Sequence, residues 1–196
     1  MNPRSALIWG FKALTPDTFG IVAAVFYNGP EPDGTALFGP LLKLRLLANT
    51  AQNRPYWTMN TLFNEDLRSG HRRSMKGSAF FAPLDLGFAR TLLNDFRLLI
   101  LQVPDAFMSI MVFEFLPYRK ITGVEGDAMA FANRGSYGNL LWIMGWSQAF
   151  NDDRIRQWVR NMSANARVEV DRVRASLTYF DLFKLNGRLR FSFPKS

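Results

Sequence analysis

One stretch of the chain indicates its fold more clearly than any other, and it reads Asn139-Leu140-Leu141-Trp142-Ile143-Met144-Gly145-Trp146. Successive side chains of a β-strand point to opposite faces of a sheet. As a strand, this stretch places Asn139, Leu141 and Ile143 on one face. The bulkier side chains Leu140, Trp142, Met144 and Trp146 fall on the other. We expect helices to cover this Trp face. The mixed face could line a cavity, although burial of both faces is the simpler alternative.

Five further segments are predicted to be strands because apolar, β-branched and aromatic residues cluster in them and turn residues bound them. The later ones follow one another and the strand at 139–146 through short connections, which favours antiparallel pairing. The five segments are Ser5–Phe11, Phe19–Asn28, Met75–Phe81, Met108–Leu116 and Asp127–Ala132.

Three segments carry apolar residues at helical spacing. The first follows Pro32-Asp33-Gly34, the second covers Leu84–Gln102, and the third begins at a cap formed by Asp152 or Asp153 and runs through Met162. A shorter helix is expected around Asn60–Leu67. With no glycine-rich strand–helix turn, the pattern indicates an α+β fold, an antiparallel sheet with helices packed on one face. Residues 1–165 are enough for one such domain.

The composition excludes several kinds of active site. There is no Cys and only one His, His71. Disulfides, Cys nucleophiles, His-based catalytic triads and His or Cys metal sites are therefore ruled out, and we name no catalytic residue and no metal ligand. Glu114 is the one acid whose position hints at function, because it lies inside the apolar strand Met111–Phe115. Its carboxylate should point to a polar or cavity face, or simply to solvent.

Basic residues are concentrated at the end of the chain. Residues 154–196 hold ten Lys and Arg against three Asp and Glu, which accounts for +7 of the formal net charge of +8. Aromatic side chains alternate with the basic ones there, as in proteins that bind single-stranded nucleic acid. One alternative function is therefore a small basic module that contacts nucleic acid or an acidic partner through residues 154–196. The charge balance elsewhere and the lack of a nucleic-acid motif disfavour nucleic acid.

Nothing in the chain is predicted to cross a membrane. The longest apolar runs, Leu98–Leu101 and Met108–Phe113, are far shorter than the roughly 20 residues that a spanning helix needs. The first ten residues lack the apolar core and cleavage site of a signal peptide. We therefore expect a cytoplasmic location if the chain is expressed as written.

A family resemblance rests on the motif Ala130-Phe131-Ala132-Asn133-Arg134-Gly135, followed by Trp146 and by Asn151-Asp152-Asp153. This order is similar to the substrate-binding domain of berberine-bridge-like, fungal-type FAD-linked oxidoreductases. The likeness covers residues 1–165 and implies the same α+β fold. Further stretches agree in order, namely Val25–Glu31, Phe38–Leu42, Met59-Asn60, Lys76-Gly77 and Pro83–Asp85.

The resemblance implies an incomplete enzyme. Family members bind FAD in an N-terminal domain, and a C-terminal segment closes that domain; this chain resembles neither part. The family's frequent base corresponds in strand register to Leu141, which cannot accept a proton. We therefore expect a truncated fragment that is inactive alone. FAD is implied by the family but is not expected to bind to this chain by itself.

The resemblance also implies a site. In the family, the sheet face that carries Asn139, Leu141 and Ile143 closes over the flavin and a small-molecule substrate. We therefore name Glu114, Asn139, Leu141 and Ile143 as candidate substrate-binding residues. With its partner domain missing, this sheet face should be exposed and could self-associate. Residues 166–196 are expected to form a basic, poorly packed C-terminal segment.

Overall fold

The computed structural model describes residues 2–61, 70–125, 128 and 137–167. Its five strands form one sheet in the order β2-β1-β4-β5-β3, and every neighbouring pair is antiparallel. The predicted α+β fold is therefore confirmed. The strands are β1 (Ser5–Ala13), β2 (Phe19–Tyr27), β3 (Arg72–Phe80), β4 (Ile110–Phe115) and β5 (Gly138–Trp146).

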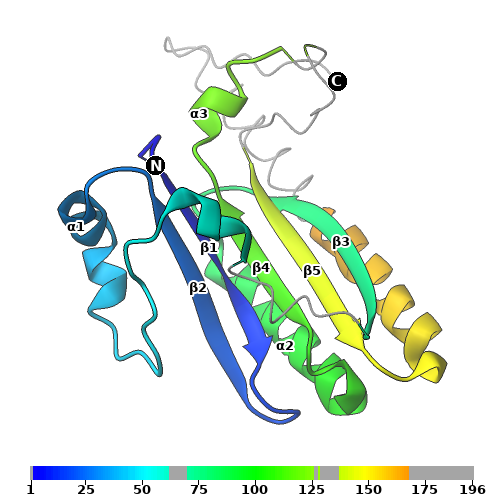
Figure 1. Cartoon of the computed structure of the whole chain (residues 1–196). Helices are drawn as coiled ribbons and strands as arrows, with labels where there is room; N and C mark the ends of the chain where they lie inside the picture. Colours follow the sequence, from blue (N-terminus) through cyan, green and yellow to red (C-terminus); the bar gives the residue numbers. More distant parts are fainter. Residues whose placement is uncertain (1, 62–69, 126–127, 129–136, 168–196) are drawn as a thin grey trace.

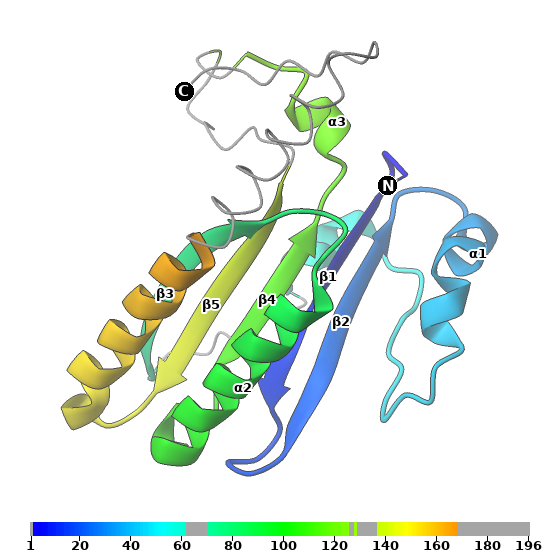
Figure 2. The same cartoon turned by 180° about the vertical axis from the view of Figure 1, so that it is seen from behind.

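Helices cover one face of this sheet. Figure 2 shows α2 (Leu86–Gln102) and a second long helix, over residues 152–167, lying side by side across the strands. Figure 1 looks onto the opposite face, which these two helices leave open, and shows α1 (Glu31–Leu42) beside the edge strand β2. We call this side, which α2 and the helix over residues 152–167 do not cover, the open face. The short elements are η1 (Tyr56–Thr61), η2 (Pro104–Ala106), α3 (Tyr118–Ile121) and η3 (Ala149–Asn151).

Two predicted elements fall largely outside the described residues. The strand expected at 127–132 has only residue 128 described, and of the helix expected at 60–67 only residues 60 and 61 are described, as the end of η1. The other predicted strands and helices are present, with ends that differ by a few residues. The last helix continues to residue 167, and Ala166 is fully buried within it.

The Trp face of β5 is the centre of the core, as predicted. Trp142 and Trp146 are fully buried, and Phe96 of α2 lies in the same cluster. An aromatic group on β1, β3 and β4 extends this cluster. Its central member, Phe113, has its ring centroid 4.8 Å from that of Trp9 and 5.4 Å from that of Phe80. Such pairs add to the stability that burial of apolar area already gives.

Local signals explain where the covering helices begin. Asp85 caps α2, because its carboxylate accepts a hydrogen bond from the Phe88 backbone N–H at 2.6 Å. The expected cap at Asp152 or Asp153 is wrong, because the last helix already includes both residues. The Asp152 carboxylate instead accepts hydrogen bonds from the side chains of Arg72 and Trp146. A tertiary contact has therefore taken the place of the local one.

Gly10 allows the two central strands to approach closely. A Cβ atom at this position would lie 2.0 Å from the Met111 carbonyl oxygen and 2.8 Å from the Val112 Cα. Because β4 supplies these atoms from its backbone, they cannot move aside as a flexible side chain would. A glycine is therefore required at this position of β1, beside the central strand β4.

Candidate functional site

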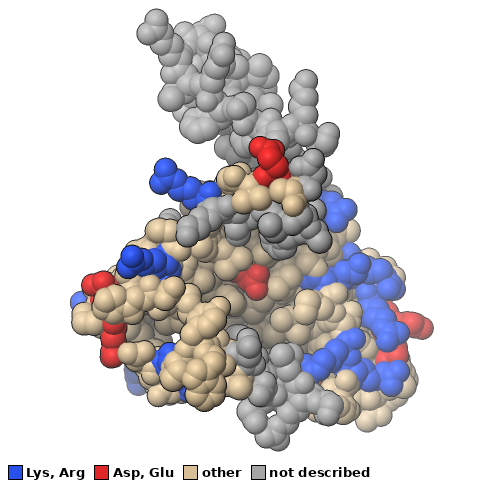
Figure 3. Space-filling model, turned by 45° about the horizontal axis from the view of Figure 1, so that its top comes forward, with Lys and Arg blue, Asp and Glu red and all other residues tan. Residues whose placement is uncertain are grey.

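The strand register assembles one continuous open face. Ile143, Leu141 and Asn139 of β5 lie directly opposite Ile110, Val112 and Glu114 of β4, so all six side chains point away from the covering helices. This surface is largely apolar. Within the five described strands, the register places only Lys12, Glu114 and Arg73 on it as charged residues. Seen in Figure 3, this side of the molecule is mostly uncharged around one acidic group in a hollow.

The four candidate substrate-binding residues therefore share one face. Glu114, Asn139, Leu141 and Ile143 are all half-buried rather than fully exposed. Neighbouring side chains account for part of this burial. For example, a Cβ atom added to Gly77 would lie 3.3 Å from a methyl group of Leu141, so Leu141 leans across the gap that this glycine leaves. These four side chains are therefore less exposed than expected from the sequence, which predicted a sheet face exposed by the lack of a partner domain.

Glu114 and Asn139 form the polar centre of the open face. The Asn139 Nδ2 donates a hydrogen bond to the Glu114 Oε2 at 3.1 Å. The Tyr118 hydroxyl donates to the Glu114 backbone oxygen at 2.9 Å, which ties α3 to the end of β4. Burial, together with the nearby negative charge of Glu114, raises the pKa of Tyr118. The remaining lone pairs of the Glu114 carboxylate can accept a hydrogen bond from a ligand.

Sequence analysis missed the other residues of this face. Val112 and Ile110 alternate with Met111 and Phe113, so the period of two could have assigned them to the side of Glu114. The contribution of β1 could not be found this way. Ile8 lies opposite Glu114, and Gly10 opposite Val112, because β1 pairs with a strand about a hundred residues away.

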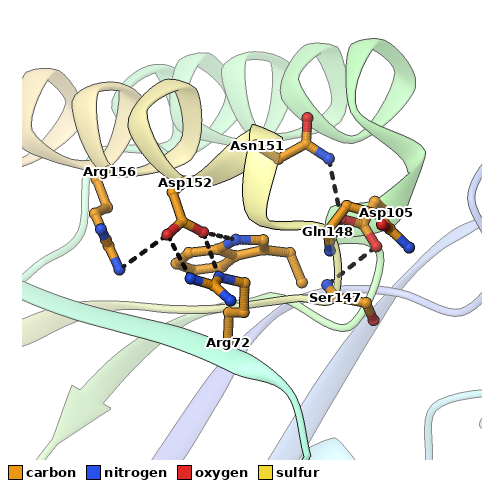
Figure 4. A network of polar contacts seen from close by, with 8 residues as sticks. Arg72, Asp105, Ser147, Gln148, Asn151, Asp152 and Arg156 are labelled. Carbon is orange, nitrogen blue, oxygen red and sulfur yellow. Dashed lines mark hydrogen bonds and ion pairs between the residues drawn. The ribbon is translucent and has the colours of Figure 1, made fainter.

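A second polar cluster lies at the other end of β5, on the side of the covering helices (Figure 4). Asp152 accepts two hydrogen bonds from Arg72, at 2.5 and 2.8 Å, and one from the Trp146 indole at 2.8 Å. Arg156 lies 3.5 Å from the same carboxylate. The Arg72 hydrogen bond is the largest of the effects that lower the pKa of Asp152 from 3.8 to about 2.

Asp105 joins η2 to the turn after β5. Its carboxylate accepts hydrogen bonds from the backbone N–H groups of Ser147 and Gln148, at 3.0 and 2.8 Å, and from the Asn151 side chain at 3.0 Å. Burial acts to raise its pKa, but these donors outweigh burial and hold the pKa below its usual value. The two clusters fix the path from β5 into the last helix.

Of the basic segment 154–196, the described part is the helix up to residue 167, so the remainder lies outside the described residues. Within the described part of the chain, no three His, Cys, Asp or Glu side chains come together where they could hold a metal ion. No helix among the described residues is long and apolar enough to cross a membrane.

Solved structures share this arrangement of strands and helices. The chain matches aclacinomycin oxidoreductase with a TM-score of 0.55, a berberine-bridge-enzyme-like protein of Arabidopsis thaliana with 0.57, and a variant of berberine bridge enzyme with 0.58. The sequence identities are 17%, 16% and 13%, and each match covers 81% of this chain. The chain has a berberine-bridge-type fold. It spans about a third of those structures, namely 32%, 35% and 33% of their lengths.

The berberine-bridge-type fold confirms the expected resemblance at the level of architecture. No family model matches the sequence, and no curated protein matches it either. The motif Ala130–Gly135, on which the resemblance was first based, lies outside the described residues. The likeness therefore depends on the sheet and its covering helices.

Proposed function

We propose that this chain supplies the substrate-facing sheet of an FAD-dependent oxidoreductase, whose flavin-binding domain is carried on another stretch of polypeptide. The observation that supports the proposal is the pairing of a berberine-bridge-type fold with one sheet face that α2 and the helix over residues 152–167 do not cover. One of the three similar proteins is named as an oxidoreductase. The match covers only about a third of each of these proteins. The cofactor and the reaction are therefore part of our proposal, because the comparisons establish neither for this chain.

The chain by itself does not fit FAD. It has no Cys, and its only His, His71, is hydrogen-bonded to Ser147 beyond the end of β5. It also lacks a glycine-rich loop of the kind that holds the phosphates of a dinucleotide. We therefore expect weak flavin binding at best, with a dissociation constant no tighter than about 1 mM, or about −4 kcal/mol.

The open face would bind and orient a small-molecule substrate. Glu114, held by Asn139, would accept a hydrogen bond from a hydroxyl or amine, while Leu141 and Ile143 would contact an apolar part. Leu141 occupies the position where the family resemblance places a base, and its alkyl group accepts no proton. The proposal therefore assigns binding and orientation to this face and no proton transfer to residue 141.

A spectroscopic experiment tests this proposal. The purified chain should show no flavin absorption, and riboflavin added at millimolar concentration should shift the amide signals of residues 139–143 in nuclear magnetic resonance spectra. The amides of α2 should not shift, because they lie behind the sheet. Near-stoichiometric flavin in the purified chain, or shifts on α2 instead of β5, would contradict the proposal.

A matched pair of variants tests whether riboflavin binds to the open face or to any exposed apolar side chain. Leu141→Lys changes the open face, whereas Leu98→Lys makes the same substitution on α2, where Leu98 is 54% exposed. Only Leu141→Lys should abolish the riboflavin shifts. It should also reduce any self-association of the chain in sedimentation experiments, since we propose that two open faces can cover one another.

A further inference from the structure

An open polar pocket of about 420 Å³ lies at the end of the sheet where β3 begins and β5 ends. It is distinct from the Glu114–Asn139 pair, which is at the opposite end of β5. None of the residues that line it is acidic. The lining residues are Gly70, His71, Arg72, Arg73, Ser147 and Arg156.

Three separate elements bring these side chains together. Arg72 and Arg73 are the first two residues of β3, Ser147 directly follows β5, and Arg156 lies in the second turn of the last helix. Antiparallel pairing places Arg72 opposite Trp146, so Ser147 is next to the start of β3. Figure 3 shows basic side chains gathered on the side of the molecule where β3 lies.

Asp152 organises the arginines without neutralising all of their charge. It binds Arg72 through Nε and Nη2 and lies 3.5 Å from Arg156, so two guanidinium groups share one carboxylate (Figure 4). A guanidinium group has five N–H donors, so donors remain on both after these contacts. The stacking of Arg156 over the Trp146 ring, at 5.8 Å, limits the orientations that its side chain can take.

The remaining lining residues add donors of other kinds. The His71 Nδ1 lies 3.2 Å from the Ser147 Oγ, and this hydrogen bond orients both side chains. Gly70 has a φ angle of 103°, a conformation that favours glycine, and a Cβ atom placed there would meet nothing within 4 Å. The backbone at Gly70 is therefore open to close approach by a ligand.

We propose that this pocket binds the phosphate group of a small molecule. Two N–H groups of an arginine guanidinium can bind two oxygen atoms of a phosphate at once. The donors around this pocket come from several directions, which suits a tetrahedral phosphate better than a planar carboxylate. The volume of about 420 Å³ exceeds the size of a phosphate ion alone and leaves room for an organic part. The proposal is independent of the substrate proposed for the open face.

The single histidine provides a direct test. His71 is the only His in the chain, so its imidazole protons give one set of nuclear magnetic resonance signals. Inorganic phosphate and adenosine monophosphate are each added at fixed pH and ionic strength, with sodium acetate and sodium chloride as controls. We expect a saturable shift of the His71 signals with both phosphate compounds. Equal shifts with acetate or chloride would show that the pocket responds only to ionic strength, and would overturn the proposal.

Two substitutions on one helix supply the matched control. Arg156→Gln removes a lining guanidinium and should raise the dissociation constant for inorganic phosphate about tenfold, the loss expected for one charge-assisted hydrogen bond. Arg160→Gln lies one turn further on, where its guanidinium bonds to Gln157 outside the pocket, and should leave the constant unchanged. If Arg156→Gln impairs folding, as judged by circular dichroism, Arg73→Gln takes its place. Equal affinity of the lining and control variants would refute the proposal.

Discussion

The two buried tryptophans of β5 should respond differently to the same substitution. Trp142 and Trp146 are both fully buried on the Trp face. The Trp146 indole donates a hydrogen bond to Asp152 at 2.8 Å. The Trp142 Nε1 has no acceptor within reach in the described part of the structure. Phenylalanine keeps an aromatic ring at each position but removes the indole N–H group.

The magnitudes follow from the groups removed. Trp→Phe deletes two ring carbon atoms, and at about 0.8 kcal/mol per buried carbon this costs about 1.6 kcal/mol at either site. At position 142 the substitution also removes a buried donor without a partner, which relieves about 1–3 kcal/mol. The net effect of Trp142→Phe should therefore lie between a loss of about 0.6 kcal/mol and a gain of about 1.4 kcal/mol in the free energy of unfolding. Trp146→Phe obtains no such relief and should cost at least about 1.6 kcal/mol.

Urea unfolding followed by far-ultraviolet circular dichroism measures both changes. In thermal melts, a difference of about 1 kcal/mol corresponds to about 2–4 °C for a chain of this size. The transition slopes should stay the same, which would show that the variants expose similar areas on unfolding. If Trp142→Phe destabilises the protein as much as Trp146→Phe, then the Trp142 N–H has a hydrogen-bond partner and the reasoning is wrong.

Two further predictions concern the faces of β5 and the acid stability of the last helix. Trp142→Ala should cost about 3–5 kcal/mol in urea melts, whereas Leu141→Ala, on the half-buried open face, should cost under about 1 kcal/mol; equal costs would contradict the face assignment. The pKa of Asp152 is about 2 when folded, against 3.8 ordinarily, so its contribution to stability is present above about pH 4 and is lost as the pH falls toward 2. Asp152→Asn should make the free energy of unfolding less dependent on pH between about pH 4 and pH 2. Asp153→Asn is the control and should leave this pH dependence unchanged.

The sequence by itself determined the positions of the five described strands to within a few residues, the long helices and the face assignment of β5. These features depend on local periodicity, which a single strand or helix displays without reference to its neighbours. The alternation from Asn139 to Trp146 was therefore enough to separate the Trp face from the side that carries Leu141. The likeness to a berberine-bridge-type fold was also visible in the order of short motifs.

Only the tertiary structure decided which strands are neighbours and which charges meet. The order β2-β1-β4-β5-β3 places Ile8 beside Glu114 and Arg72 beside Trp146, although these partners are far apart in the chain. Asp152 illustrates the physical reason. Its local sequence predicted a helix cap, but hydrogen bonds from Arg72 and from the indole of Trp146 hold its carboxylate in the folded protein. Such contacts depend on the arrangement of the whole sheet, which local periodicity does not encode.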